Sequence, residues 1–361
     1  MAKDNILVIG GYGKVGQTIC NILGQEHPGK VIAAGRSLKK AVTFCDTTEG
    51  RVRPLQLDIT APLDPVLLEN TSVVVMCLDQ NDMHVVEHCA KTGTHYIDIT
   101  ASFQLLSQIA SRDAMFRESG ATALMSIGLA PGITNLMVSE AHGHIGHHEQ
   151  SDISIMLGLG EAHGQAAMDW TVAGMNESYT VIEQGNSRAV ESFTEGKVVD
   201  FGGRWGKRKA YRFNFCDQHV LPHTLSIPTV STRLCLDSRW ITVMLAVFKK
   251  LGGMRLLKYR SVSNTVIAMM GWFAGGKPQF SVKVDSWGYQ AGDTSKRVHI
   301  EQFLHGLREA EITAIVAASV IESVYHGNKP HGAYHIEQLF TLHDLLSTIG
   351  SKVDYTMKYT N

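Results

Sequence analysis

The first 130 residues alternate short apolar runs with amphipathic stretches of helical period. The apolar runs cover Ile6–Ile9, Val31–Ala34, Val52–Leu57, Ser72–Leu78, His95–Ile99 and Ala121–Ser126. Helical patterns lie between them at Val15–Leu23, Leu38–Cys45, Met83–Lys91 and Phe103–Glu118. Near-continuous apolar strands that alternate with helices form a parallel sheet covered on both faces. The pattern therefore predicts an α/β fold that begins with a doubly wound Rossmann domain over residues 1–135.

The pattern changes in the following part of the chain, where polar and apolar positions alternate. Such alternation at Ser151–Leu157, Gln279–Ser286 and Arg297–Phe303 is typical of antiparallel strands with one packed face. Helical patterns cover Gln165–Glu183, Trp240–Lys249, Met254–Phe273 and Ala310–Tyr325. We expect an inserted α+β substrate domain with a mixed or antiparallel sheet over residues 136–305, and a C-terminal segment, 306–361, that returns to the first domain.

The first strand ends in a glycine motif, Gly11-x-Gly13-x-x-Gly16, and a helical pattern begins at once. Glycines let the backbone turn tightly and approach a ligand closely, while the helix N-terminus attracts negative charge. The alternative is a strand–helix turn without a ligand, but the strand before and the helix after it are the context that supports nucleotide binding. The motif predicts a site for the pyrophosphate of a dinucleotide.

The second strand ends in Gly35-Arg36-Ser37, with Lys39 and Lys40 close behind. An acidic residue at this place would bind the ribose 2′-hydroxyl of NAD, whereas an arginine accommodates the 2′-phosphate of NADP. The sequence therefore predicts NADP as the cofactor.

Composition and charge narrow the class of protein. The 361 residues are enough for two domains, and the hydrophobic content of 44% is that of a globular protein. With 33 basic and 34 acidic residues, nothing favours a nucleic acid or an acidic membrane as partner. The apolar runs are too short to span a membrane, and the first strand starts too early for a signal peptide. Six scattered cysteines without a CxxC pair indicate reduced thiols, so we expect a cytoplasmic protein.

Polar residues close several successive strands of the predicted sheet. Asp58 follows the third strand, Asp79-Gln80-Asn81 the fourth, and Tyr96, Asp98 and Thr100 belong to the fifth or follow it. Ligands of open parallel sheets bind outside the carboxyl ends of the strands. Asn81 alone is explained equally well as a helix cap, and Asp58 as a turn residue. As a set, these side chains predict a ligand-lined edge.

Three further features concern possible chemistry. The histidine-rich stretch His142 to Glu149 lacks metal-ligand spacing and is interpreted as a solvated helix end, so no metal is predicted. Arg233 in an apolar strand needs a partner, which Asp237 or a substrate carboxylate would supply. The chain has neither the Tyr-x-x-x-Lys pair of short-chain reductases nor a cysteine in a setting for covalent catalysis, which leaves hydride transfer without a covalent intermediate.

These motifs together resemble the saccharopine dehydrogenase family, in its NADP-binding branch with saccharopine reductases and carboxynorspermidine synthases. The matching segments are Val8–Gly16, Ala34–Ser37, Leu57-Asp58, His95–Asp98, Gly128–Asn135 and Gly327–Glu337. The resemblance implies reversible, NADPH-dependent reduction of an imine formed between an amine and a carbonyl compound, with an amino acid or polyamine as substrate. Some members have an aspartate just before the Pro-Gly turn. Ala130 stands there in this chain, which argues against saccharopine itself.

The resemblance also implies roles for individual residues. The pyrophosphate would be held by Gly11, Tyr12, Gly13, Lys14 and Val15, and the 2′-phosphate by Gly35, Arg36 and Ser37. Adenine would meet Asp58 and Ile59, while Leu78, Asp79 and Thr100 would flank the nicotinamide. We expect the substrate to contact Gln80, Pro131, Gly132 and Arg233. Tyr96, Asp98 and His163 are the alternatives for proton transfer, and the sequence does not choose among them.

Two functions from different classes fit these features. The first is an NADP-dependent oxidoreductase that acts on a C–N bond or a related imine or carbonyl of an amino-acid-like small molecule. The second is a non-catalytic NADP(H)-binding redox sensor, which the lack of a known catalytic pair leaves open. Alternating strands in the second domain could extend a sheet across a two-fold axis, so a homodimer is expected.

Overall fold

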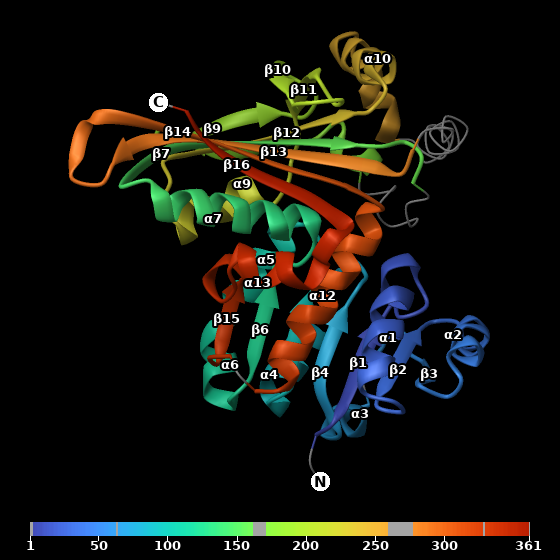
Figure 1. Cartoon of the computed structure of the whole chain (residues 1–361). Helices are drawn as coiled ribbons and strands as arrows, with labels where there is room; N and C mark the ends of the chain where they lie inside the picture. The colour runs from blue at the N-terminus through green and yellow to red at the C-terminus, as the bar shows by residue number, and fades with distance from the viewer. Residues whose placement is uncertain (1–2, 63, 162–170, 259–276, 328, 361) are drawn as a thin grey trace. The chain divides into compact units, whose positions relative to one another are not determined.

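The computed structural model describes residues 3–62, 64–161, 171–258, 277–327 and 329–360. The chain divides into two compact units, each made of two chain segments (Figure 1). The first unit comprises Met1–Gly132 and Ala310–Phe340, and the second comprises Ile133–Glu309 and Thr341–Asn361. Part of the C-terminal segment thus completes the first unit, whereas its last residues belong to the second.

The first unit is built on a seven-stranded sheet in which every pairing is parallel. In spatial order the strands are β15 (Gly332–His335), β6 (Thr122–Met125), β5 (His95–Asp98), β4 (Thr71–Met76), β1 (Asn5–Ile9), β2 (Val31–Gly35) and β3 (Val52–Gln56). Their apolar residues are buried on both sides of the sheet, as the near-continuous hydrophobic runs predicted. The order reverses between β1 and β4, which defines the switch point where ligands bind in such sheets.

Helices lie on both faces of this sheet (Figure 1). They are α1 (Lys14–Glu26), α2 (Leu38–Cys45), α3 (Pro65–Glu69), α4 (His84–Thr92), α5 (Phe103–Ala110), α6 (Asp113–Ser119) and α12 (Glu309–Tyr325), with short 3-10 turns at Asp46–Thr48 and Ile336–Gln338. The predicted helix Phe103–Glu118 is therefore two helices. The doubly wound Rossmann arrangement is confirmed.

The second unit contains a seven-stranded mixed sheet. Its strands are, in spatial order, β10 (Lys197–Asp200), β11 (Lys207–Arg212), β12 (Thr229–Leu236), β7 (His147–Leu157), β13 (Gln279–Gln290), β14 (Asp293–Leu307) and β16 (Val353–Thr360). Only β12 and β7 run parallel, and the other neighbours are antiparallel. A separate hairpin pairs β8 (Ser178–Glu183) with β9 (Asn186–Glu191). The expected second domain with a mixed sheet is thus confirmed.

Four helices of the second unit are described in full. They are α7 (Thr134–His144), α9 (Asp217–Thr224), α10 (Arg239–Lys250) and α13 (Leu342–Ile349), with 3-10 turns at Gly253–Lys258 and Gly350–Lys352. The predicted helix Gln165–Glu183 is wrong at its end, because Ser178–Glu183 forms β8 with Tyr179 and Val181 turned inward. Residues 162–170 lie outside the described residues, as does most of the predicted helix Met254–Phe273.

Asp217 at the start of α9 is fully buried in the second unit. Its Oδ1 accepts hydrogen bonds from the Thr232 hydroxyl at 2.5 Å and from the Gln218 N–H at 2.8 Å. Burial penalises the charged carboxylate and raises the pKa of Asp217 to about 6. The native state therefore binds this proton more tightly than the unfolded chain does.

We expect Asp217 to make folding less favourable as the pH rises from about 4 to 7. Because the native pKa lies about two units above the unfolded value, ionisation costs about 3 kcal/mol of stability. Replacing Asp217 by asparagine keeps an acceptor at Oδ1 and removes the titration. Urea unfolding of both proteins across this pH range should show the stability difference moving in favour of the variant. A difference that stays constant with pH would contradict the assignment.

Candidate functional site

The glycines of the turn after β1 have two different roles. Two of them are required by close packing, and one faces open space. A Cβ at Gly16 would overlap the carbonyl oxygen of Gly10, and one at Gly11 would lie 2.7 Å from Cα of Ala33. At Gly13, by contrast, the nearest described atom is the Gly10 oxygen at 3.1 Å. Gly13 is exposed and caps α1 without a side-chain hydrogen bond. The first turn of α1 therefore offers backbone N–H groups beside an open space, as a pyrophosphate site requires.

Tyr12 connects this turn with the end of β2. Its hydroxyl accepts a hydrogen bond from the N–H of Ser37 at 3.0 Å. Its ring lies against Gly35, where a Cβ would come within 2.6 Å of the ring. Gly35 must therefore be a residue without a side chain, and Tyr12 holds the phosphate turn beside Arg36 and Ser37. Sequence reasoning grouped Tyr12 with the pyrophosphate and missed this bracing role, for which the sequence carries no local signal.

The residues at the ends of β2 and β3 lie at the same edge of the sheet. The side chain of Arg36 is exposed, and Ser37 caps α2 by accepting from the Lys40 N–H at 3.3 Å. The Asp58 carboxylate is exposed and accepts from the backbone N–H and hydroxyl of Thr60 at 3.0 and 2.8 Å. These two hydrogen bonds lower the pKa of Asp58, and Arg36 contributes to the same effect. A guanidinium thus stands beside a fixed carboxylate where adenosine binds in such folds.

Four predicted residues form one hydrogen-bonded network at the ends of β4 and β5. The Tyr96 hydroxyl donates to Oδ2 of Asp98 at 2.7 Å, and the Thr100 hydroxyl donates to Oδ1 at 2.5 Å. The Gln80 amide lies 2.6 Å from the Tyr96 hydroxyl and 3.3 Å from Oδ2 of Asp98. Tyr96 and Asp98 are fully buried. Burial raises the pKa of both groups, and Asp79 raises that of Asp98 further.

The Gln80 side chain is held in place and has unused bonding capacity. Its Oε1 is buried and finds no hydrogen-bond partner among the residues that the structure describes. An unsatisfied buried acceptor costs about 1–3 kcal/mol unless a ligand or water pairs with it. Leu78, two residues earlier, lies beside the phosphate turn, since a Cβ at Gly10 would be 3.0 Å from its side chain. The end of β4 thus offers one apolar and one polar contact to a ligand.

The turn after β6 contains the predicted Pro131 and Gly132, both buried. The Leu129 N–H donates to the Thr313 hydroxyl at 3.2 Å, which fixes the turn to α12. At the adjoining strand ends, Ser126 Oγ lies 2.8 Å from Nδ1 of His335, whose pKa burial lowers to about 4. Thr313 and His335 were not predicted, because they come from the distant C-terminal part of the chain.

Arg233 belongs to the second unit, and its carboxylate partner within the protein is Asp152 and not Asp237. Its Nη1 lies 2.6 Å from Ser231 Oγ and 3.7 Å from the carboxylate of Asp152. Asp152 also accepts from Lys197 at 2.6 Å, and these cations together lower its pKa despite burial. Asp237, by contrast, accepts from the Leu159 N–H at 3.3 Å. Of the two partners considered for Arg233, Asp237 is therefore wrong, and the substrate carboxylate stays a prediction. The predicted His163 lies outside the described residues.

The histidine-rich stretch is only partly a solvated helix end. His144 and His147 are exposed, but His148 is buried, and its Nε2 lies 2.9 Å from Ser151 Oγ. His142 stacks on His148 with ring centroids 5.3 Å apart, and burial lowers the pKa of His148 to about 4. The interpretation is therefore corrected for His148, which β7 carries into the interior.

No helix in the described part of the chain is long and apolar enough to cross a membrane.

Comparisons with known proteins agree with this geometry. Residues 6–124 match the family model of the saccharopine dehydrogenase NADP-binding domain. The fold matches an apo saccharopine dehydrogenase (L-Glu forming) from Saccharomyces cerevisiae with a TM-score of 0.70 and 13% identity, covering 99% of this chain and 100% of that one. A meso-DAP dehydrogenase mutant from Clostridium tetani, with DAP, gives a TM-score of 0.48 at 14% identity, covering 95% and 96%. A probable dehydrogenase from Thermotoga maritima gives 0.44 at 10%, covering 96% and 93%. The latter two scores are too low to carry an argument, and no curated protein sequence matches the chain.

Residues 6–124 thus form an NADP-binding Rossmann domain of the type found in saccharopine dehydrogenase-like oxidoreductases. Over residues 6–124, the match to this family model supports the resemblance to the saccharopine dehydrogenase family seen in the sequence. The yeast enzyme shares its fold over nearly the whole chain.

Proposed function

We propose that this protein transfers a hydride between NADP(H) and the carbon of an imine or related C–N bond in an amino-acid-like or polyamine-like metabolite. The observation that carries the proposal is the polar network at the ends of β4 and β5. It places the free Oε1 of Gln80 at the edge of the sheet that also bears the glycine turn and Arg36. That acceptor suits the N–H of the nicotinamide carboxamide or of a protonated imine.

The proposed contacts with the pyrophosphate and the 2′-phosphate lie at this same edge of the sheet. The first turn of α1 would hold the pyrophosphate through the N–H groups of Lys14 and Val15, while Gly13, whose N–H donates to the Gly10 oxygen at 2.8 Å, would leave space for it. Arg36 would pair with the 2′-phosphate, and Asp58 with Ile59 would border adenine. Leu78 and Thr100 would flank the nicotinamide. Bound NADPH supplies the hydride, while these residues orient it.

Tyr96 and Asp98 fit positioning better than proton transfer. Both oxygens of Asp98 accept hydrogen bonds, and the Tyr96 hydroxyl lies between Asp98 and Gln80. Their buried, mutually satisfied atoms support the role of fixing Gln80 and Thr100. Of the three alternatives, we therefore assign proton transfer to His163, since imidazole titrates near neutral pH. Pro131, Gly132 and Arg233 are the proposed substrate contacts.

The proposed reaction is tested by the absorbance of NADPH during turnover. The protein is mixed with NADPH and single amines, single 2-oxo acids or semialdehydes, and amine–carbonyl pairs. Oxidation that requires both an amine and a carbonyl compound supports imine reduction. Oxidation with a carbonyl compound alone would show a carbonyl reductase instead. Tight NADPH binding without turnover across the panel would favour the redox sensor.

A homodimer is the proposed assembly. The eight-residue strand β16 stands at the end of the mixed sheet, where a second copy would extend the pairing antiparallel across a two-fold axis. Light scattering coupled to size exclusion measures the mass in solution. A monomer at micromolar concentration would contradict the proposal.

A further inference from the structure

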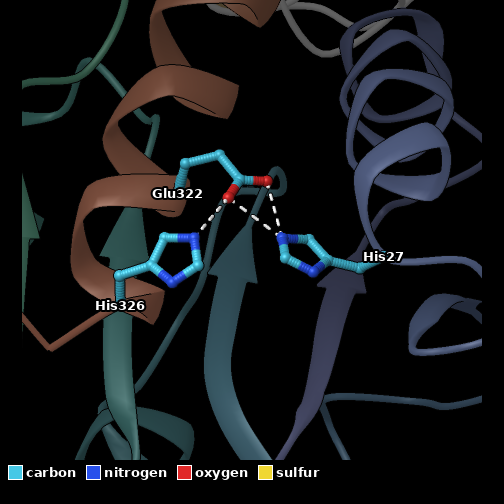
Figure 2. A group of neighbouring side chains, drawn as sticks. All are labelled: His27, Glu322 and His326. Atoms are coloured by element: carbon cyan, nitrogen blue, oxygen red, sulfur yellow. Dashed lines mark hydrogen bonds and ion pairs between the residues drawn. The ribbon is translucent and has the colours of Figure 1, made fainter.

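Three side chains from distant parts of the sequence converge on one face of the first unit (Figure 2). His27 directly follows α1, Glu322 lies in the last turns of α12, and His326 follows the end of that helix. Nε2 of His27 lies 2.8 and 2.9 Å from the two carboxylate oxygens of Glu322. Nε2 of His326 lies 3.3 Å from Oε2 of the same carboxylate. A carboxylate thus stands between two imidazoles.

The spacing of these atoms matches a first coordination shell. One ligand atom of each residue lies within 4.8 Å of the other two. Two ligands bound tetrahedrally at about 2.0–2.1 Å from zinc lie roughly 3.3 Å apart. The separations of the two imidazoles from the Glu322 carboxylate, 2.8 and 3.3 Å, are close to this value, and the two imidazole nitrogens lie within 4.8 Å of each other. Residues four apart lie on the same face of a helix, which explains why Glu322 and His326 reach the same point.

The net charge of the three side chains and the packing around them also suit a divalent cation. One carboxylate and two neutral imidazoles carry a single negative charge, and this ligand set is one that zinc binds in proteins. The Tyr325 ring packs against the His27 ring with centroids 4.7 Å apart, and its hydroxyl donates to the backbone oxygen of Asp4 at 3.0 Å. The side chain of His326 is 59% exposed, so an ion can enter and water can complete the shell.

A second group of potential ligands in the described residues is already neutralised by a lysine. Asp285, His299 and Glu301 also lie within 4.8 Å of one another. However, the ammonium of Lys283 lies 3.1 Å from Asp285 and 2.7 Å from Glu301. The protein thus supplies its own cation there. No described lysine or arginine forms an ion pair with Glu322, whose carboxylate contacts His27 and His326 instead.

We propose that His27, Glu322 and His326 bind a divalent transition-metal ion of the zinc type. The ion would bridge the end of α1 to the end of α12 and so join the N-terminal segment of the first unit to its C-terminal segment. His27 precedes β2, so this site lies at the amino edge of the parallel sheet, whereas the glycine turn lies at the carboxyl edge. The ion would be structural and would take no part in hydride transfer.

The test uses the full chain without a histidine tag, stripped with a chelator and titrated with Zn²⁺ against a chromophoric chelator. Variants H27A and H326A should each weaken the tightest zinc affinity at least about tenfold, because a ligand is lost. H144A is the matched control, since His144 lies 3.3 Å from Glu140 at the same four-residue spacing. The described residues offer that pair no third ligand. H144A should bind zinc as the unmodified protein does.

Two further readouts make the outcome decisive. Zn²⁺ should raise the melting temperature of the unmodified protein and of H144A, but not that of H326A. Co²⁺ should give the intense visible absorption of a tetrahedral site, and H326A should lose it. The exposed His326 side chain makes that variant safe for folding if H27A proves unstable. Unchanged zinc affinity and an unchanged Co²⁺ spectrum in H326A would overturn the proposal.

Discussion

Replacing Gly13 by valine is expected to abolish NADPH binding while the protein stays folded. The backbone of Gly13 has φ −77° and ψ 172°, which any residue can adopt. The nearest protein atom to a new Cβ would be the Gly10 oxygen at 3.1 Å, so the fold needs only a slight local adjustment. The valine side chain would instead fill the space of the pyrophosphate. Because the second glycine of this motif lets the backbone approach the pyrophosphate, we expect NADPH affinity to fall by at least about a hundredfold, or roughly 2.7 kcal/mol.

Fluorescence titration with NADPH and a thermal melt separate the two effects in the Gly13 variant. Gly143→Val is the matched control, since Gly143 is exposed in α7 and no described atom lies within 4 Å of its Cβ position. The control should keep NADPH affinity. Normal NADPH binding by the Gly13 variant would show that the phosphates lie elsewhere.

Replacing Arg36 by aspartate should reverse the preference for NADPH over NADH. The variant removes a charge-assisted contact worth about 1.5–3 kcal/mol and places a negative charge beside the 2′-phosphate. We therefore expect NADPH affinity to fall by about a hundredfold or more, at roughly 1.4 kcal/mol per tenfold. NADH affinity should change little, because an acidic residue accepts from the 2′-hydroxyl.

Lys39→Asp is the control for the Arg36 variant, because it makes the same charge change on an exposed residue of α2. Both variants are titrated with NADPH and NADH at one ionic strength, since screening alters such contacts. If Arg36→Asp weakens both cofactors equally, Arg36 does not bind the 2′-phosphate. If Lys39→Asp has the same effect as Arg36→Asp, the preference comes from general charge.

The first unit was predictable because its signals are local. Buried parallel strands are nearly continuous apolar runs, and the glycine turn is contiguous in sequence. Tyr96, Asp98 and Thr100 follow one another at every second position, so their part of the network at the end of β5 also had a sequence signal. In β8, however, only Tyr179 and Val181 are buried on one side of a small hairpin, and this short stretch continued the helical pattern that was predicted to begin at Gln165.

The missed contacts join residues that the sequence separates widely. Arg233 pairs with Asp152 because β12 and β7 are neighbouring parallel strands. Asp237 was considered as a partner only because it is close to Arg233 in the sequence. The expectation of no metal rested on the spacing of His142 to Glu149. His27 and Glu322 are 295 positions apart, so no motif could bring them together before the fold was known. Such pairs depend on tertiary packing, which local patterns do not contain.

The edge strand β15 of the first sheet is synthesised much later than the other six strands of that sheet. β15 covers the edge of β6, yet the ribosome makes it only after the first segment of the second unit, Ile133–Glu309. Until then the nascent Rossmann sheet carries an open β6 edge, a surface that invites pairing with other chains. The nucleotide-binding unit is therefore translated first, but its sheet can be completed only when β15 has been made. Chaperone protection is most valuable between the synthesis of β6 and that of β15.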